Sequence, residues 1–217
     1  MRINSTSTNT FTSLAKPVLA ETIIKGGQAV TIREAQTSKD LSKVAKAMTK
    51  AFRFRFRLAN ELGTKRENFE AREQFRLMSP TTMTKSFVDY LKDILSIEDK
   101  KTTVLMVEDK YDKDKVIGYA IMHTAGEEND TAIIDDASME YEFREPFGLY
   151  LLHNITNSAK GLYDKILTRR FPIATACNPE YNDLGYRLVD EKKSDKLNFD
   201  YGDQPYEWLE KNLISFY

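Results

Sequence analysis

The apolar positions of the chain follow two periods, which together predict a mixed α/β fold. Apolar residues recur at helical spacing through 41–52, 83–95 and 147–160. Short runs rich in β-branched and aromatic residues predict strands, and these runs are 29–33, 102–108, 116–124, 131–139, 172–177, 186–189 and 206–213. The expected element order is therefore β-α-α-β-β-β-α-β-β-β.

This order also predicts how the strands pair. The strands expected at 102–108, 116–124 and 131–139 are joined by short charged or glycine-containing turns, which is typical of an antiparallel meander. The helix expected at 147–160 and the strand after it form a β-α-β crossover, which joins parallel strands. We therefore expect an α+β mixed sheet with helices on both faces.

The chain length and the composition of the amino-terminal segment limit the possible domain organisation. The chain has 217 residues, which fits one domain with an extra arm. Its start is rich in Ser, Thr and Asn and has no apolar signal-peptide core, so we assign 1–25 to a flexible N-terminal arm and 26–217 to a single domain. A partner-binding or targeting role for the arm stays open. No apolar run approaches the roughly 20 residues that cross a bilayer, and we expect a soluble, cytoplasmic protein.

Charge and ligand residues exclude several classes of protein. The formal net charge of −1 gives no overall field that would attract nucleic acid or an acidic membrane. The single cysteine, Cys177, excludes an internal disulfide framework. The two histidines, His123 and His153, are far apart in the sequence. We therefore expect no metal, because a zinc site needs three or four clustered ligands.

Four short motifs suggest a family. They are IREA at 32–35 followed by Asp40, VIGYA at 116–120, YNDLGY at 181–186 and YEWLEKNL at 206–213. In order and spacing these motifs resemble those of the GNAT superfamily of N-acetyltransferases, over about residues 29–213. The resemblance implies the GNAT-like acyl-CoA N-acyltransferase fold, with acetyl-CoA as co-substrate and an amine as acceptor.

The resemblance also locates a cofactor segment that departs from the family pattern. The family reads [QR]-x-x-G-x-[GA] before a helix whose first backbone N–H groups cradle the cofactor pyrophosphate. The aligned segment here is EPFGLY at 145–150, in which only the glycine matches and the proline removes one donor. The cofactor contacts implied by the resemblance are Arg144, Phe147, Gly148, Leu149, Tyr150 and Asn178. This chain is thus expected to be a divergent member with a degenerate loop.

Transfer to an amine needs two proton transfers. By resemblance, Tyr181 would protonate the departing thiolate; the alternative is that it only packs beneath the cofactor segment. Asp136 or Glu140 would be the base, with Asp135 also available. Strand alternation places Asp136 and Glu140 on one face and Asp135 on the other. The alternative for each acid is a strand edge facing water.

The sequence therefore favours an acyl-CoA-dependent N-acetyltransferase acting on a primary amine of a small molecule or protein. A catalytically silent GNAT-fold binding or regulatory module is the alternative suggested by the altered loop. A nucleic-acid-binding protein is a third hypothesis, in which Arg53, Arg55 and Arg57 share one face if 52–57 is a strand and spread if it is a helix. A membrane partner is not expected, and a homodimer stays open.

Overall fold

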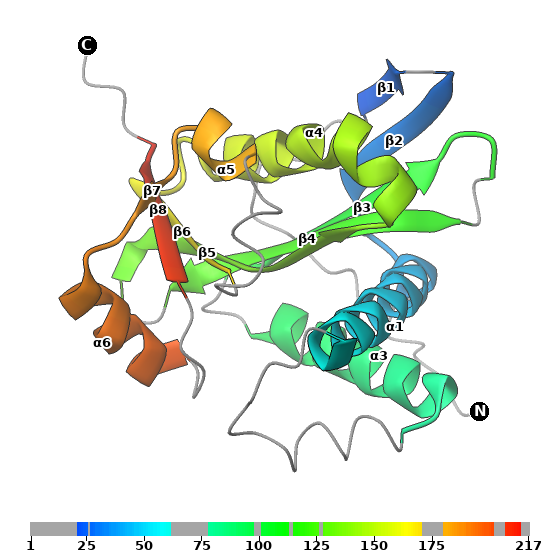
Figure 1. Cartoon of the computed structure of the whole chain (residues 1–217), viewed down its shortest axis with the longest axis horizontal. Helices are drawn as coiled ribbons and strands as arrows, with labels where there is room; N and C mark the ends of the chain where they lie inside the picture. Colours follow the sequence, from blue (N-terminus) through cyan, green and yellow to red (C-terminus); the bar gives the residue numbers. More distant parts are fainter. Residues whose placement is uncertain are drawn as a thin grey trace, which may run out of the picture.

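The structure of the protein is a computed structural model (Figure 1). It describes residues 21–25, 27–61, 78–97, 101–112, 115–125, 128–170, 180–201 and 207–213. The strands are β1 (Glu21–Lys25), β2 (Gln28–Glu34), β3 (Thr103–Asp109), β4 (Val116–Ala125), β5 (Glu128–Met139), β6 (Lys165–Arg170), β7 (Arg187–Leu188) and β8 (Glu207–Asn212). The helices are α1 (Ser38–Glu61), α3 (Pro80–Ser96), α4 (Tyr141–Ala159), α5 (Glu180–Asp183) and α6 (Glu191–Tyr201).

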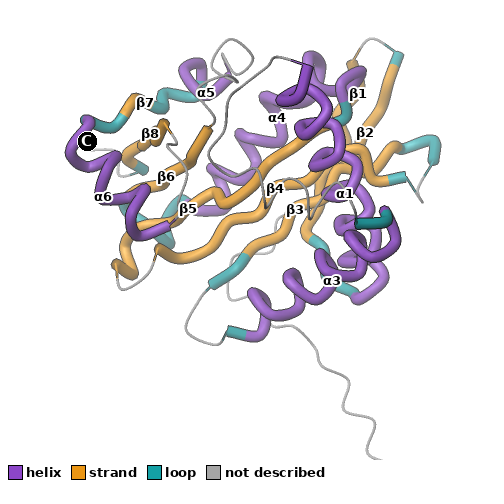
Figure 2. The backbone as a smooth tube through the Cα atoms, turned by 60° about the horizontal axis from the view of Figure 1, so that its bottom comes forward, coloured by secondary structure: helices purple, strands orange, loops and turns teal. Residues whose placement is uncertain are grey.

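The strands form one 8-stranded sheet in the order β1-β2-β3-β4-β5-β6-β8-β7. Every neighbouring pair is antiparallel except β5 and β6, which are parallel and joined by α4. Helices α4 and α5 lie on one face, whereas α1, α3 and α6 lie on the other (Figures 1 and 2). The predicted mixed sheet with helices on both faces is confirmed.

Each face of the sheet has its own core. On the α4 face, Ile134, Phe147 and Ile155 belong to one cluster of buried side chains. On the face covered by α1 and α3, Val44 and Leu91 belong to a second cluster with side chains of β3 and β4. The helical apolar stripes read from the sequence are thus the buried sides of these helices.

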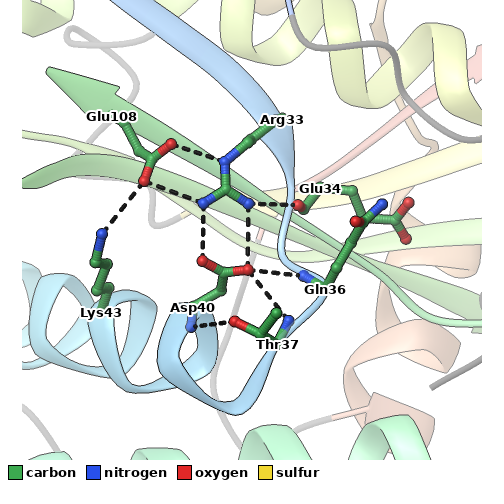
Figure 3. Close-up of polar contacts among 7 residues, drawn as sticks. All are labelled: Arg33, Glu34, Gln36, Thr37, Asp40, Lys43 and Glu108. Carbon is green, nitrogen blue, oxygen red and sulfur yellow. Dashed lines mark hydrogen bonds and ion pairs between the residues drawn. The ribbon is translucent and has the colours of Figure 1, made fainter. Parts of the chain in front are cut away.

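The start of α1 is fixed to the sheet by an ionic network (Figure 3). Arg33 on β2 donates to both oxygens of Asp40, at 2.8 and 3.2 Å, and also to Glu108 on β3. Asp40 accepts from the Thr37 N–H, and the Asp40 N–H donates to the Thr37 hydroxyl, each at 3.1 Å. This reciprocal pattern is a capping box, in which Thr37 caps the helix.

Four segments differ from the sequence-based expectations. Strand β1 occupies residues assigned to the arm and pairs with β2. Strand β6 and helix α6 were not predicted, because their apolar residues are few and interrupted by charges. The strand expected at 172–177 lies outside the described residues. Helix α1 continues to Glu61, so the strand interpretation of 52–57 is wrong.

Within the described ranges, no helix combines the length and the apolar character that crossing a membrane requires.

Candidate functional site

The pairing between β5 and β6 ends partway along both strands. Their parallel ladder runs from Thr131 opposite Lys165 to Ile134 opposite Thr168. Beyond this point β5 continues beside β4 to Met139, and β6 continues beside β8 to Arg170. We call the place where the two strands cease to pair the strand split. In α/β sheets, the carboxyl ends of neighbouring parallel strands are the usual position of ligands.

A bulge in β5 lies at the strand split. Ile121 of β4 is opposite Asp136, but the next residue, Met122, is opposite Ile134, so Asp135 is the extra residue. A bulge changes the direction in which neighbouring side chains point. Asp135 and Asp136 therefore both contact tyrosines of the α1/α3 side. The expectation that they lie on opposite faces is wrong, because strict alternation does not hold through a bulge.

Asp135 joins three elements. The Tyr90 hydroxyl of α3 donates to Asp135 Oδ2 at 2.5 Å, and Arg169 Nη2 of β6 donates to Asp135 Oδ1 at 2.6 Å. Burial raises the pKa of Tyr90 well above its usual range, as does the charge of the Asp135 carboxylate. Tyr90 therefore remains a hydrogen-bond donor at any pH at which the protein is studied. The sequence pointed to the two adjacent acids but not to Tyr90 and Arg169, the partners of Asp135.

The two predicted bases occupy different positions at the end of β5. Asp136 Oδ2 accepts a hydrogen bond of 2.6 Å from the Tyr119 hydroxyl of β4. Glu140 follows the strand, and its carboxylate forms ion pairs with Lys50 of α1 at 3.1 Å and Lys115 at 3.5 Å. Both acids thus contact residues on the side of the sheet that α1 covers. Their catalytic roles stay predictions.

Helix α4 begins directly after Glu140, at Tyr141. The helix expected from 147 thus begins earlier, and the aligned segment EPFGLY at 145–150 lies inside it. Glu140 occupies the N-cap position but makes no side-chain capping hydrogen bond. The N–H groups that a helix cannot satisfy with its regular hydrogen bonds are those at its start. Two of those at the start of α4 already donate, Glu140 to the Ile117 carbonyl and Phe143 to the Glu140 carbonyl.

The predicted cofactor contacts are distributed around α4. Phe147 is fully buried in the core, whereas Leu149 and Tyr150 are each 37% exposed. Arg144 and Gly148 are half-buried. The segment 147–150 lies beyond the first turn of α4, and its role in cofactor binding stays a prediction. Asn178 lies outside the described residues.

The YNDLGY segment packs on α4. Tyr181 in α5 is 7% exposed, and its ring meets the Tyr186 ring edge-on with centroids 5.4 Å apart. The Tyr186 hydroxyl is hydrogen-bonded to the Thr156 hydroxyl of α4 at 2.8 Å, and burial raises the pKa of Tyr186. Gly185 has a φ of 81°, a conformation that favours glycine, and this turn lets the Tyr186 N–H donate to the Tyr181 carbonyl.

The structure brings the candidates together in two groups. Tyr181 and Phe147 belong to the core cluster on the α4 face. Asp136 and Glu140 contact residues of the opposite, α1-covered side. The two groups therefore lie on opposite faces of the sheet. Among the described residues, no group of three or more His, Cys, Asp or Glu side chains could hold a metal ion.

Comparisons with known proteins identify the fold. No protein-family model matches the chain, and no curated protein sequence does. An acetyltransferase structure from Streptococcus agalactiae matches 85% of this chain and 98% of its own, with a TM-score of 0.57 and 12% identity. A GNAT-family acetyltransferase from Staphylococcus aureus matches 85% of this chain and 99% of its own, with a TM-score of 0.55 and 12% identity.

A third similar structure includes a cofactor. A protein from Salmonella typhimurium, described as an acetyltransferase with its cofactor acetyl-CoA, matches 87% of this chain and 96% of its own, with a TM-score of 0.51 and 14% identity. At such identities the likeness establishes the fold. The chain has the fold of the GNAT acetyltransferases, as its motifs predicted.

Proposed function

We propose that the protein is an acyl-CoA-dependent N-acetyltransferase that transfers an acetyl group to a primary amine of a small molecule or a protein. The observation that carries this proposal is the strand split in a GNAT fold. The described pairing of β5 with β6 ends at Ile134 and Thr168. The carboxyl ends of neighbouring parallel strands are where ligands usually lie in α/β sheets, which supports a cofactor site at this place.

The start of α4 suits the cofactor's phosphates. The first-turn N–H groups and the positive end of the helix dipole favour an anion there. The negative charge of Glu140 would oppose this, but Lys50 and Lys115 both pair with that carboxylate. The missing N–H of Pro146 does not affect the site, because this residue lies beyond the first turn. The phosphate contact would then lie at the first turn of α4, before the segment 147–150.

The side chains offer both proton transfers. When bound, acetyl-CoA supplies the activated acetyl group. Tyr181 Oη would hold the proton that the departing thiolate requires, since a phenol is protonated at neutral pH. The carboxylate of Asp136 or Glu140 would accept a proton from the amine. Because Tyr181 and the acids lie on opposite faces, the acceptor would approach from the α1/α3 side.

The test is thiol release from acetyl-CoA in the presence of amines. A panel containing a polyamine, an aminoglycoside, a lysine peptide and a peptide with a free amino terminus covers small-molecule and protein acceptors. We expect release above the acetyl-CoA hydrolysis rate with at least one of them, and the acetylated product by mass spectrometry. Binding of acetyl-CoA without release for any amine would contradict the transferase and favour a silent binding module.

A further inference from the structure

The YNDLGY segment ends in a Schellman motif, which closes α5. The Tyr186 N–H donates to the Tyr181 carbonyl and the Gly185 N–H donates to the Asn182 carbonyl, each at 2.9 Å. Gly185 has the positive φ that this helix ending requires. The contact between the Tyr181 and Tyr186 rings is the apolar contact that often accompanies the motif. The motif therefore fixes Tyr181 relative to Tyr186.

A lysine of β8 binds the carbonyl at the centre of this motif. Lys211, which belongs to the YEWLEKNL motif, donates from Nζ to the Leu184 carbonyl. The same Nζ lies 5.9 Å from the centroid of the Tyr186 ring, within the range of a cation–π contact. A cation is favoured at the end of a helix, where the last carbonyls have no partner within the helix. Lys211 thus connects the end of α5 to the sheet.

We propose that Lys211 is a positioning residue for Tyr181. Its ammonium group holds the end of α5 against β8 and thereby keeps the Tyr181 phenol where it protonates the departing thiolate. The inference rests on the proposed function, because it concerns the acid of that reaction. Lys211 itself takes no part in the proton transfer.

Helix α5 needs such support because it is short. It has 4 residues, and a single helical turn is not stable alone because helix nucleation is unfavourable. Its position therefore depends on contacts with the rest of the molecule, which include the packing of Tyr181 in the core on the α4 face and the bond from Lys211. Apolar packing is non-directional, whereas a hydrogen bond also fixes direction. A displacement of about 1 Å can lower an enzymatic rate by about 10²-fold.

The neighbouring residue on β8 provides a matched control. Glu210 forms an ion pair of 2.6 Å with Lys193 of α6, and successive residues of a strand point to opposite faces of the sheet. Helix α6 lies on the face opposite α5 (Figure 1). Lys193→Met therefore removes an ammonium group bound to the same strand but on the other face. It should leave both kcat and the Kd of acetyl-CoA unchanged.

The experiment measures kcat for thiol release from acetyl-CoA, with the amine of the panel above that gives the highest rate, and the Kd of acetyl-CoA by isothermal titration calorimetry. Lys211→Met keeps most of the side-chain length but removes the charge and the donors. We expect it to lower kcat by about 10- to 100-fold and to leave the Kd unchanged. In a Tyr181→Phe background it should change kcat by less than about twofold, because a residue that acts through the Tyr181 hydroxyl then has nothing to position.

The double variant separates a positioning role from an independent one. Losses that multiply when Lys211→Met and Tyr181→Phe are combined would show that Lys211 acts independently of Tyr181, and they refute the inference. A reduced kcat in Tyr181→Phe together with a wild-type kcat in folded Lys211→Met also refutes the inference, and leaves the proposed function intact. If circular dichroism shows that Lys211→Met is unfolded, Lys211→Gln takes its place, with the same expected loss and the same contradicting results.

Two outcomes would concern the proposed function as well. A wild type that releases no thiol with any amine overturns the proposed function and this inference with it. A wild-type kcat in Tyr181→Phe removes the acid from the proposed reaction, and Lys211 then has no role in it.

Discussion

At the scale of single residues, Arg33 of the IREA motif and Asp40 form an ion pair that connects β2 to the start of α1. Burial would raise the pKa of Asp40, but hydrogen bonds from Arg33, the Gln36 backbone and Thr37 outweigh it and lower the pKa from 3.8 to about 2. A carboxyl whose pKa is lowered on folding stabilises the protein above its unfolded pKa. That contribution is lost as the pH falls from about 4 toward about 2.

Replacing Asp40 tests how much this ion pair stabilises the protein. At neutral pH, Asp40→Asn should lower the free energy of unfolding by about 1 to 2 kcal/mol, because the charge-assisted bonds to Arg33 are lost. The difference from the wild type should shrink as the pH falls from about 4 toward about 2, since the carboxyl becomes protonated first in the unfolded and then in the folded wild type. Urea denaturation of both proteins between pH 6 and the lowest pH at which they fold measures the gap. A gap independent of pH would contradict the assignment.

Tyr181 and Tyr186 permit a paired test of the proposed acid. Their rings touch in one cluster, but only Tyr181 is assigned a proton-transfer role. Tyr181→Phe should reduce kcat for amine acetylation by about 10² to 10⁴, the usual worth of a general acid, and leave the Kd of acetyl-CoA unchanged.

Tyr186→Phe is the control for that substitution. It should lower stability by about 1 kcal/mol, through loss of the hydrogen bond to Thr156, and leave kcat unchanged. Equal turnover in Tyr181→Phe and the wild type would show that Tyr181 only packs.

The residues of the site could be predicted from the sequence only in part. The paired acids at 135–136 and the tyrosine of YNDLGY were found because their types and positions are unusual. The direction in which the Asp135 side chain points could not be predicted from the sequence, because it depends on a bulge in the pairing of β5 with β4. Tyr90 and Arg169 were missed for the same reason, since their roles come from a contact between distant segments.

At the scale of elements, the start of α4 is the main difference from expectation. Pro146 and Gly148 both disfavour a helix interior, and the sequence was therefore interpreted as a loop up to 146. The structure includes both residues in α4, between Tyr141 and Ala159. Packing of Phe143 and Phe147 in the core on the same side of the helix offsets the poor local propensity.

Two prolines distinguish these alternatives. Pro146 lies inside α4, where its missing N–H leaves out a helical hydrogen bond, so Pro146→Ala should raise the free energy of unfolding by about 1 to 3 kcal/mol. Pro80 lies at the first position of α3, where no N–H is needed, and Pro80→Ala should change stability little. Chemical denaturation compares the two variants. A neutral Pro146→Ala would mean that α4 begins near residue 146.

The course of α1 bears on the nucleic-acid hypothesis. The backbone of 52–57 is helical, and the Phe52 ring packs edge-on against Phe87 of α3. The strand on which the shared arginine face depended is therefore not present in this segment. The spacing of apolar residues could not predict this continuation, because the strict alternation after Phe52 is equally compatible with a strand.

At the scale of the whole molecule, the sheet order and the placement of helices follow from the pattern of apolar residues and one crossover. The meander and the α4 crossover were predicted because hairpins and β-α-β units leave local signals. The residues that form β6, and the end of its pairing with β5 at Ile134, were not, because the register of strands distant in sequence has no local signal. The strand split, on which the proposed function rests, is a property of the assembled sheet.

Acetyl-CoA binding tests the central claim most directly. A ligand that binds only the folded state, at about 100 times its Kd, stabilises it by about 2.7 kcal/mol. For a protein of this size that corresponds to a rise in Tm of about 5 to 10 °C. We predict such a rise with acetyl-CoA in a thermal-shift measurement. An unchanged Tm at saturating acetyl-CoA, propionyl-CoA and CoA would contradict the account.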